Sequence, residues 1–119
     1  MNGKVTWITG SSTAGKTTLA WQMKRPGDVV IDGDEIRFIH SNKGGYSFGD
    51  TWRHNVYVAH LAALVARQGV HVFVALVCPY KKLRDEVQAI TDCSFVYLSG
   101  GNEDEYEYEQ DKKYFRADK

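Results

Sequence analysis

Cysteine and proline are scarce in this sequence, and neither sign of charge is in excess. The two cysteines, Cys78 and Cys93, are too few for a disulfide framework, and no Cys or His spacing is typical of a zinc site. We therefore expect reduced thiols in a cytoplasmic protein. Fifteen basic and fifteen acidic residues cancel, which argues against an overall basic field for nucleic acid. The longest apolar run, 72–78, is far too short to cross a membrane.

The chain of 119 residues has the length of one domain, and its hydrophobic fraction of 43% is typical of a globular protein. Runs rich in β-branched residues alternate with segments in which apolar residues recur every three or four positions. This alternation predicts an α/β fold, in which a mostly parallel sheet of about four strands lies between helices. The expected strands are 4–9, 28–32, 70–77 and 94–98, and the expected helices are 16–24, 33–39, 51–68 and 80–90.

A glycine-rich loop lies between the first expected strand and the first expected helix. It fits the pattern G-x-x-x-x-G-K-[ST] at every fixed position and has the strand–loop–helix context that this motif requires. Main-chain N–H groups of such a loop point at phosphate oxygens, and the helix N-terminus adds positive potential. Lys16 is expected to reach the β- and γ-phosphates of ATP, and Thr17 to ligate Mg²⁺. The expected ATP-binding residues are Gly10, Ser11, Ser12, Thr13, Ala14, Gly15, Lys16, Thr17 and Thr18.

The second expected strand ends in Asp32-Gly33-Asp34, at the edge where ligands bind open α/β sheets. The third ends in Val77-Cys78-Pro79, without a carboxylate for Mg²⁺. We therefore predict that Asp32 completes the metal shell and that Asp34 accepts the proton of an acceptor hydroxyl. Arg37, one helical turn further on, is expected to pair with an anionic group of the acceptor. The alternative is an Asx turn, with Asp34 capping a helix.

In order along the chain, these motifs resemble those of the adenylyl-sulfate (APS) kinases, which read LDGDxxR, GFS, D-R-x-E-N and then SPYR followed by RD. The resemblance implies a P-loop kinase fold and transfer of the γ-phosphoryl group of MgATP to a ribose hydroxyl. The DGD–Arg segment also resembles the acceptor motif of polynucleotide kinases, in which the Asp three residues before the Arg is the base, here Asp34. The matching segments are 10–18, 31–37, 46–48, Asn55 and 78–81 with 84–85.

The departures from APS kinase concentrate on the acceptor side. The segment that reads D-R-x-E-N in the family is Thr51-Trp52-Arg53-His54-Asn55 here, and SPYR becomes CPYK. We interpret these changes as an eroded pocket for a small sulfated nucleotide. Because an open acceptor side suits a bulky acceptor, our first hypothesis is a kinase of the bacteriophage DNA-hypermodification class, acting on 5-hydroxymethyluracil in DNA. The expected acceptor-binding residues are Arg37, Phe48, Arg53, Asn55 and Lys81.

Two other functions stay open from the sequence. One is APS kinase itself, which phosphorylates the 3′-hydroxyl of APS, and the other is a nucleotide-binding module without turnover. A phage origin would place the protein in the host cytoplasm. The sequence is compatible with a monomer and with a homo-oligomer. We treat 1–119 as one P-loop kinase domain, in which 101–119 is either a charged tail or a residual lid. Lys112, Lys113 and Arg116 are the candidate lid cations in that segment.

Overall fold

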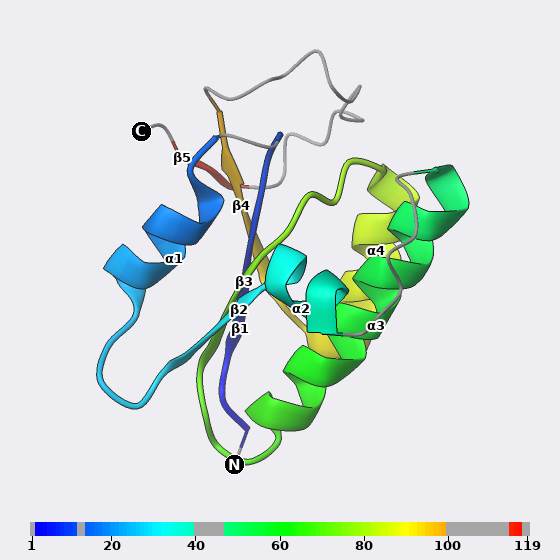
Figure 1. Ribbon diagram of the computed structural model, residues 1–119. Coiled ribbons are helices and arrows are strands. Elements are labelled where there is room, and N and C mark those ends of the chain that lie inside the picture. Colours follow the sequence, from blue (N-terminus) through cyan, green and yellow to red (C-terminus); the bar gives the residue numbers. More distant parts are fainter. Residues whose placement is uncertain (1, 12–13, 40–46, 100–114, 118–119) are drawn as a thin grey trace.

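A parallel sheet forms the centre of the molecule, and its strands run in the order β2-β3-β1-β4-β5. The computed structural model describes residues 2–11, 14–39, 47–99 and 115–117, and Figure 1 shows their arrangement. The strands are β1 (Val5–Thr9), β2 (Val29–Asp32), β3 (Val72–Ala75), β4 (Ser94–Leu98) and β5 (Phe115–Ala117). The helices are α1 (Lys16–Met23), α2 (Gly33–Ile39), α3 (Phe48–Ala66) and α4 (Lys81–Thr91).

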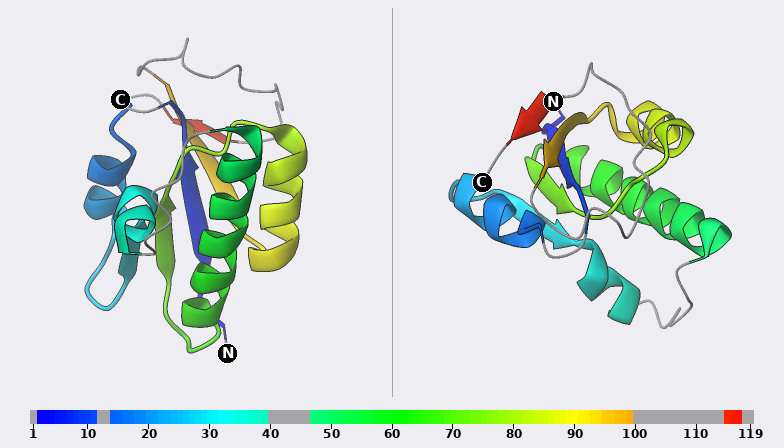
Figure 2. Two further views of the ribbon diagram at one scale, coloured as in Figure 1. Left: turned by 45° about the vertical axis from the view of Figure 1, so that its right-hand side comes forward. Right: turned by 90° about the horizontal axis from the view of Figure 1, so that it is seen from above.

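The sheet lies between two layers of helices, with α1 on one face and α3 and α4 on the other (Figures 1 and 2). Alternate residues of one strand point to opposite faces, so each strand supplies two cores. In β1, Trp7 belongs to the core under α3 and α4, whereas Ile8 belongs to the core under α1. Val74 and Ala75 of β3 divide in the same way. The α/β fold predicted from the sequence is therefore confirmed.

The apolar segment 70–77 yields a strand of only four residues, β3. Beyond its end, the amide of Leu76 still donates to the carbonyl of Ile8, and the amide of Cys78 donates to the hydroxyl of Thr9. These bonds hold the segment after β3 against the end of β1 without extending the ladder. The continuous apolar character thus reflects burial beside β1 as well as strand formation.

Helix α3 begins at Phe48, three residues before the expected start at 51. Ser47 caps it, because its hydroxyl accepts from the amide of Asp50 at 3.1 Å and satisfies one of the free N–H groups of the first turn. The apolar stripe of α3, which includes Val58, Ala62 and Ala66, packs on the sheet. No helix in the described residues is both long and apolar enough to cross a membrane.

The C-terminal segment differs most from expectation. Phe115–Ala117 pairs with β4 as a short fifth parallel strand, with Arg116 in register with Tyr97. The sequence predicts four strands, because a three-residue strand after a highly charged segment leaves no periodic pattern. Lys112 and Lys113 lie outside the described residues, and Arg116 belongs to a strand rather than to a loop.

Candidate active site

The glycine-rich loop lies between β1 and α1, at the carboxyl edge of the sheet (Figure 1). Gly10 and Gly15 both have positive φ values, 145° and 96°, which residues with a Cβ rarely adopt. A Cβ at Gly10 would also collide with the carbonyl oxygen of Leu98 in β4. Both fixed glycines of the motif are therefore required by main-chain geometry. Ser12 and Thr13, two of the expected ATP-binding residues, lie outside the described residues.

Two sources of positive potential lie at this loop, the ammonium group of Lys16 and the N-terminus of α1. The ammonium group of Lys16 donates to the carbonyl of Ser11 at 2.8 Å, which places its charge over the loop. Gly15 is the N-cap of α1 and provides no side chain to bond the first amides of the helix. Those amides and the helix dipole can therefore act on an anion. Ala14 is fully buried under the loop, whereas Thr18 is exposed in the first turn of α1.

A hydrogen bond connects the last position of the loop motif to the end of β2. The hydroxyl of Thr17 donates to a carboxylate oxygen of Asp32, Oδ2, at 3.1 Å. A hydroxyl and a carboxylate at this distance form the oxygen-rich pair that Mg²⁺ prefers, with substrate phosphates and water completing the shell. In the described residues, no three His, Cys, Asp or Glu side chains gather into a metal-binding group. The pair fits a metal that is held jointly by the protein and a nucleotide.

Asp32 also caps the N-terminus of helix α2. Its other oxygen, Oδ1, accepts from the amide of Asp34 at 2.9 Å, as an N-cap side chain does. The alternative of an Asx turn at this helix start is thus present, but the capping residue is Asp32 rather than Asp34. The carboxylate of Asp34 lies on the exposed first turn of α2, and Arg37 lies half-buried one turn later. Capping and a metal-binding role are compatible, because the two oxygens of Asp32 face different partners.

Gly33, between the two acids, is buried against Leu76, which follows the end of β3. A Cβ at this position would collide with the side chain of Leu76. Its carbonyl oxygen accepts from Nε2 of His54, which lies 2.8 Å away on α3. His54 is nearly inaccessible to solvent. This contact cannot be predicted from the sequence, because a histidine on a predicted helix carries no signal of a backbone partner on another element.

Asn55 follows His54 and is also buried. Its amide nitrogen donates to the carbonyl of Thr51 at 2.9 Å and to that of Val77 at 3.0 Å. Its carbonyl oxygen, Oδ1, has no hydrogen-bond partner in the described residues. A buried amide oxygen without a donor is costly, which makes it a candidate to accept from a bound molecule.

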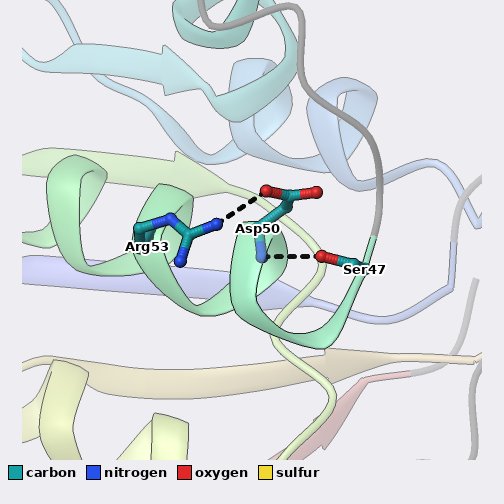
Figure 3. Close-up of polar contacts among 3 residues, drawn as sticks. All are labelled: Ser47, Asp50 and Arg53. Carbon is teal, nitrogen blue, oxygen red and sulfur yellow. Dashed lines mark hydrogen bonds and ion pairs between the residues drawn. The ribbon is translucent and has the colours of Figure 1, made fainter.

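Arg53 lies on the exposed side of α3 and is paired with Asp50 at 2.8 Å, one turn earlier (Figure 3). The cap hydroxyl of Ser47 and then this guanidinium lower the pKa of Asp50. The expected acceptor residue Arg53 therefore lies near the N-terminus of α3, and its guanidinium forms an ion pair with a residue of the same helix. Lys81 is similarly paired with Asp85, at 3.2 Å in the first turns of α4.

An aromatic cluster joins the N-termini of α3 and α4. The ring of Phe48 lies 4.6 Å from that of Tyr80 and 5.5 Å from that of Trp52, measured between centroids. The indole N–H of Trp52 donates to Glu86 at 3.1 Å. Phe48 is 59% exposed, so this cluster presents an open aromatic face. Tyr46, another aromatic residue of the motif, lies outside the described residues.

The phosphate loop, the acidic pair and the aromatic cluster lie near the point where the order of the strands reverses, between β1 and β3. After β1 the chain crosses to β2 by way of α1 on one face, and after β3 it crosses to β4 by way of α4 on the other. Neighbouring strands whose connections leave on opposite faces mark the crevice in which open α/β sheets bind ligands. The glycine-rich loop follows β1, and the segment with Cys78 and Tyr80 follows β3. The phosphate loop, the acidic pair and the aromatic cluster therefore belong to one edge of the sheet.

Comparison with known proteins identifies the family. The family model for adenylylsulphate kinase matches residues 2–117. The chain belongs to the adenylylsulphate kinase family. This family is one of P-loop phosphotransferases that act on a hydroxyl group. The resemblance stated from the motifs is confirmed at this level, whereas the DNA-modifying branch stays a prediction.

Named relatives match about three quarters of this adenylylsulphate kinase family member. It is 40% identical over 95 residues to a probable bifunctional SAT/APS kinase 2 of Sorangium cellulosum. The matched region covers 75% of this chain and 16% of that protein. It is 38% identical over 91 residues to a probable adenylyl-sulfate kinase of Pyrococcus abyssi, 71% and 52% of the two chains. The chain thus spans about half the length of the single-function relatives that it matches.

A solved structure shares the architecture. The Mycobacterium tuberculosis APS kinase CysC in complex with AMPPNP and APS superposes with a TM-score of 0.75 at 28% identity, covering 87% of this chain and 66% of that one. The P-loop kinase fold expected from the sequence is therefore confirmed.

Proposed function

We propose that this protein transfers the γ-phosphoryl group of MgATP to the 3′-hydroxyl of adenylyl sulfate. The contact between Thr17 and Asp32 carries the proposal, because it joins the phosphate loop to the acidic turn that follows β2. Membership of the adenylylsulphate kinase family supports this acceptor. So does the similarity to a structure that contains AMPPNP and APS. These similarities favour adenylyl sulfate over the DNA acceptor that the open acceptor side first suggested.

The phosphate side supplies positioning and charge. Main-chain amides of the loop and the N-terminus of α1 bind the phosphate oxygens, and Lys16 neutralises charge on the transferring group. Thr17 and Asp32 would hold Mg²⁺, which neutralises phosphate charge when bound. Phosphoryl transfer requires little covalent chemistry from the protein, so this arrangement accounts for most of the expected rate.

The acceptor side orients the hydroxyl that attacks. Asp34, two residues beyond the Asp32 cap, accepts the proton of that hydroxyl, and Arg37 pairs with the anionic part of the acceptor. Oδ1 of Asn55 is buried without a hydrogen-bond partner in the described residues, and we assign it to accept a hydrogen bond from the bound acceptor. Phe48 offers its exposed ring for stacking, while Arg53 and Lys81 contribute positive charge from the first turns of α3 and α4.

The test is an incubation of the purified chain with ATP labelled in the γ-phosphoryl group, Mg²⁺ and one of two acceptors. Adenylyl sulfate is compared with an oligonucleotide that contains 5-hydroxymethyluracil. We expect label on the small nucleotide, and no transfer when EDTA removes Mg²⁺. Label on the oligonucleotide alone would establish the DNA acceptor instead. Tight ATP binding without label on either acceptor would support a module without turnover.

Two acidic variants locate the base. Asp34→Asn is expected to lower transfer by about 10²-fold, because the hydroxyl loses its proton acceptor, while ATP binding is retained. Glu35→Gln is the matched control, since Glu35 is the next residue of α2 and is also exposed. Equal loss in both variants would remove Asp34 from the role of base.

A further inference from the structure

Helix α3 bonds to the chain segments that follow two different strands. His54 donates from Nε2 to the carbonyl of Gly33, directly after β2, and Asn55 donates to the carbonyl of Val77, after β3. Both side chains are buried, and their acceptors are main-chain atoms at the edge where the candidate active site lies. Adjacent residues of one helix therefore bond to both of the segments that follow these paired strands.

The contact at Gly33 fixes the chemistry of the histidine. A carbonyl oxygen only accepts, so Nε2 of His54 must carry a proton, in either the neutral ring or the imidazolium. The adenylylsulphate kinase motif D-R-x-E-N has Glu at this place. An ionised carboxylate only accepts and cannot donate to a carbonyl. The bond to Gly33 thus depends on the residue that replaces that Glu in this chain.

Gly33 in turn connects the two acids. Its α-carbon side is packed against Leu76, its carbonyl is held by His54, and the flanking residues are joined by the bond from the Asp34 amide to Asp32. Asp32 also accepts from Thr17 of the phosphate loop. A shift of the Gly33 peptide would therefore change the separation of the two carboxylates and their position relative to the loop.

We propose that His54 is a positioning residue, which sets the relative placement of Asp32 and Asp34 by holding the Gly33 carbonyl. The consequence for turnover rests on the proposed function, whereas the contact itself does not. His54 is nearly inaccessible to solvent and bonds to main chain, so its replacement is expected to lower kcat and to leave the KM for ATP nearly unchanged.

The ring contact can be measured without any activity. In uniformly ¹⁵N-labelled protein, long-range ¹H–¹⁵N correlation spectra of the histidine rings distinguish the two neutral tautomers and the imidazolium. We expect a proton on Nε2 of His54, with a slowly exchanging resonance because the ring is buried. A neutral ring protonated on Nδ1 would overturn the proposal, whatever the enzyme's turnover.

Three variants test the effect on the acids. His54→Gln retains an N–H donor near the position of Nε2, and His54→Leu removes it while filling much of the volume. His60→Leu is the matched control, since His60 lies on α3 but is exposed. We expect kcat to fall about 10- to 100-fold in His54→Leu, with rescue to within about threefold in His54→Gln. The amide resonances of Asp32 and Asp34 should shift only in His54→Leu.

The outcomes separate a positioning role from a packing role. Equal loss of kcat in the Gln and Leu variants, or wild-type kcat in a folded His54→Leu protein, would overturn the proposal. If the wild-type chain transfers no phosphoryl group, the proposed function fails, and the ring spectra together with the amide shifts still decide whether His54 holds Gly33. If His54→Leu does not fold, the spectra of wild type and His54→Gln decide it.

Discussion

The two halves of the candidate active site are built from different material. The phosphate half consists of main chain and of residues fixed by main chain, namely two glycines with positive φ and a helix N-terminus without a side-chain cap. The acceptor half consists of side chains on α2, α3 and α4, and two of its cations already pair with neighbours, Arg53 with Asp50 and Lys81 with Asp85. A sequence motif describes the first kind of site well, because loop geometry requires particular residues. It describes the second poorly, because each side chain chooses among partners that only the fold brings near.

The largest expected effect lies in the phosphate half. Lys16→Ala should lower phosphoryl transfer by about 10²- to 10³-fold, because its ammonium group is the side-chain charge held over the loop. Transfer is measured with labelled ATP at saturating acceptor. Lys24→Ala is the matched control, since Lys24 ends the same helix and packs over the ring of Trp21 instead. Comparable loss in both variants would mean that the lysine charge at the loop is not what matters.

The next effect concerns Gly33, which lies between Asp32 of the phosphate half and Asp34 of the acceptor half. Gly33→Ala should lower the free energy of unfolding by about 1–3 kcal/mol, because the added methyl group overlaps Leu76. Urea unfolding measures it. In the Leu76→Ala background the same substitution should cost clearly less, since the space is then open. Identical costs in the two backgrounds would show that the loss comes from the backbone and not from this overlap.

The features that the sequence predicts correctly are those encoded by residues close together in the chain. The glycine-rich loop, the Asp32-Gly33-Asp34 turn and the fold class follow from patterns within a few neighbouring residues, and the structure places the first two in contact through Thr17 and Asp32. The bond from His54 to Gly33 joins residues 21 positions apart, and no periodicity encodes it. The strand β5 is missed for a similar reason, because it forms by pairing with β4, which no local pattern predicts. The missing information is thus the choice of partner, which depends on tertiary packing.

The third effect asks whether Arg53 serves the acceptor or only its own helix. If it contributes charge to the acceptor, Arg53→Ala should raise the KM for adenylyl sulfate about tenfold and leave the KM for ATP unchanged. Stability should change by less than about 0.5 kcal/mol, because an exposed pair within one helix contributes little. Arg67→Ala is the control, since Arg67 lies at the other end of α3. An unchanged KM for adenylyl sulfate would assign Arg53 to the pair with Asp50 alone.

The smallest effect concerns a residue outside both halves and provides a baseline for the comparison. Burial raises the pKa of the Cys93 thiol to about 11, and burial likewise raises the pKa of Cys78. Because the folded pKa is the higher one, the folded state binds the proton more tightly, and the contribution to stability is complete below the unfolded value near 9. It is lost as pH rises toward 11, with a cost of about 1 kcal/mol at about pH 10. Urea unfolding of wild type and Cys93→Ala from neutral to alkaline pH measures this as the difference in slope. Equal slopes would show that the thiol titrates at the same pH in the folded and unfolded states, and the alkaline loss would then belong to other groups.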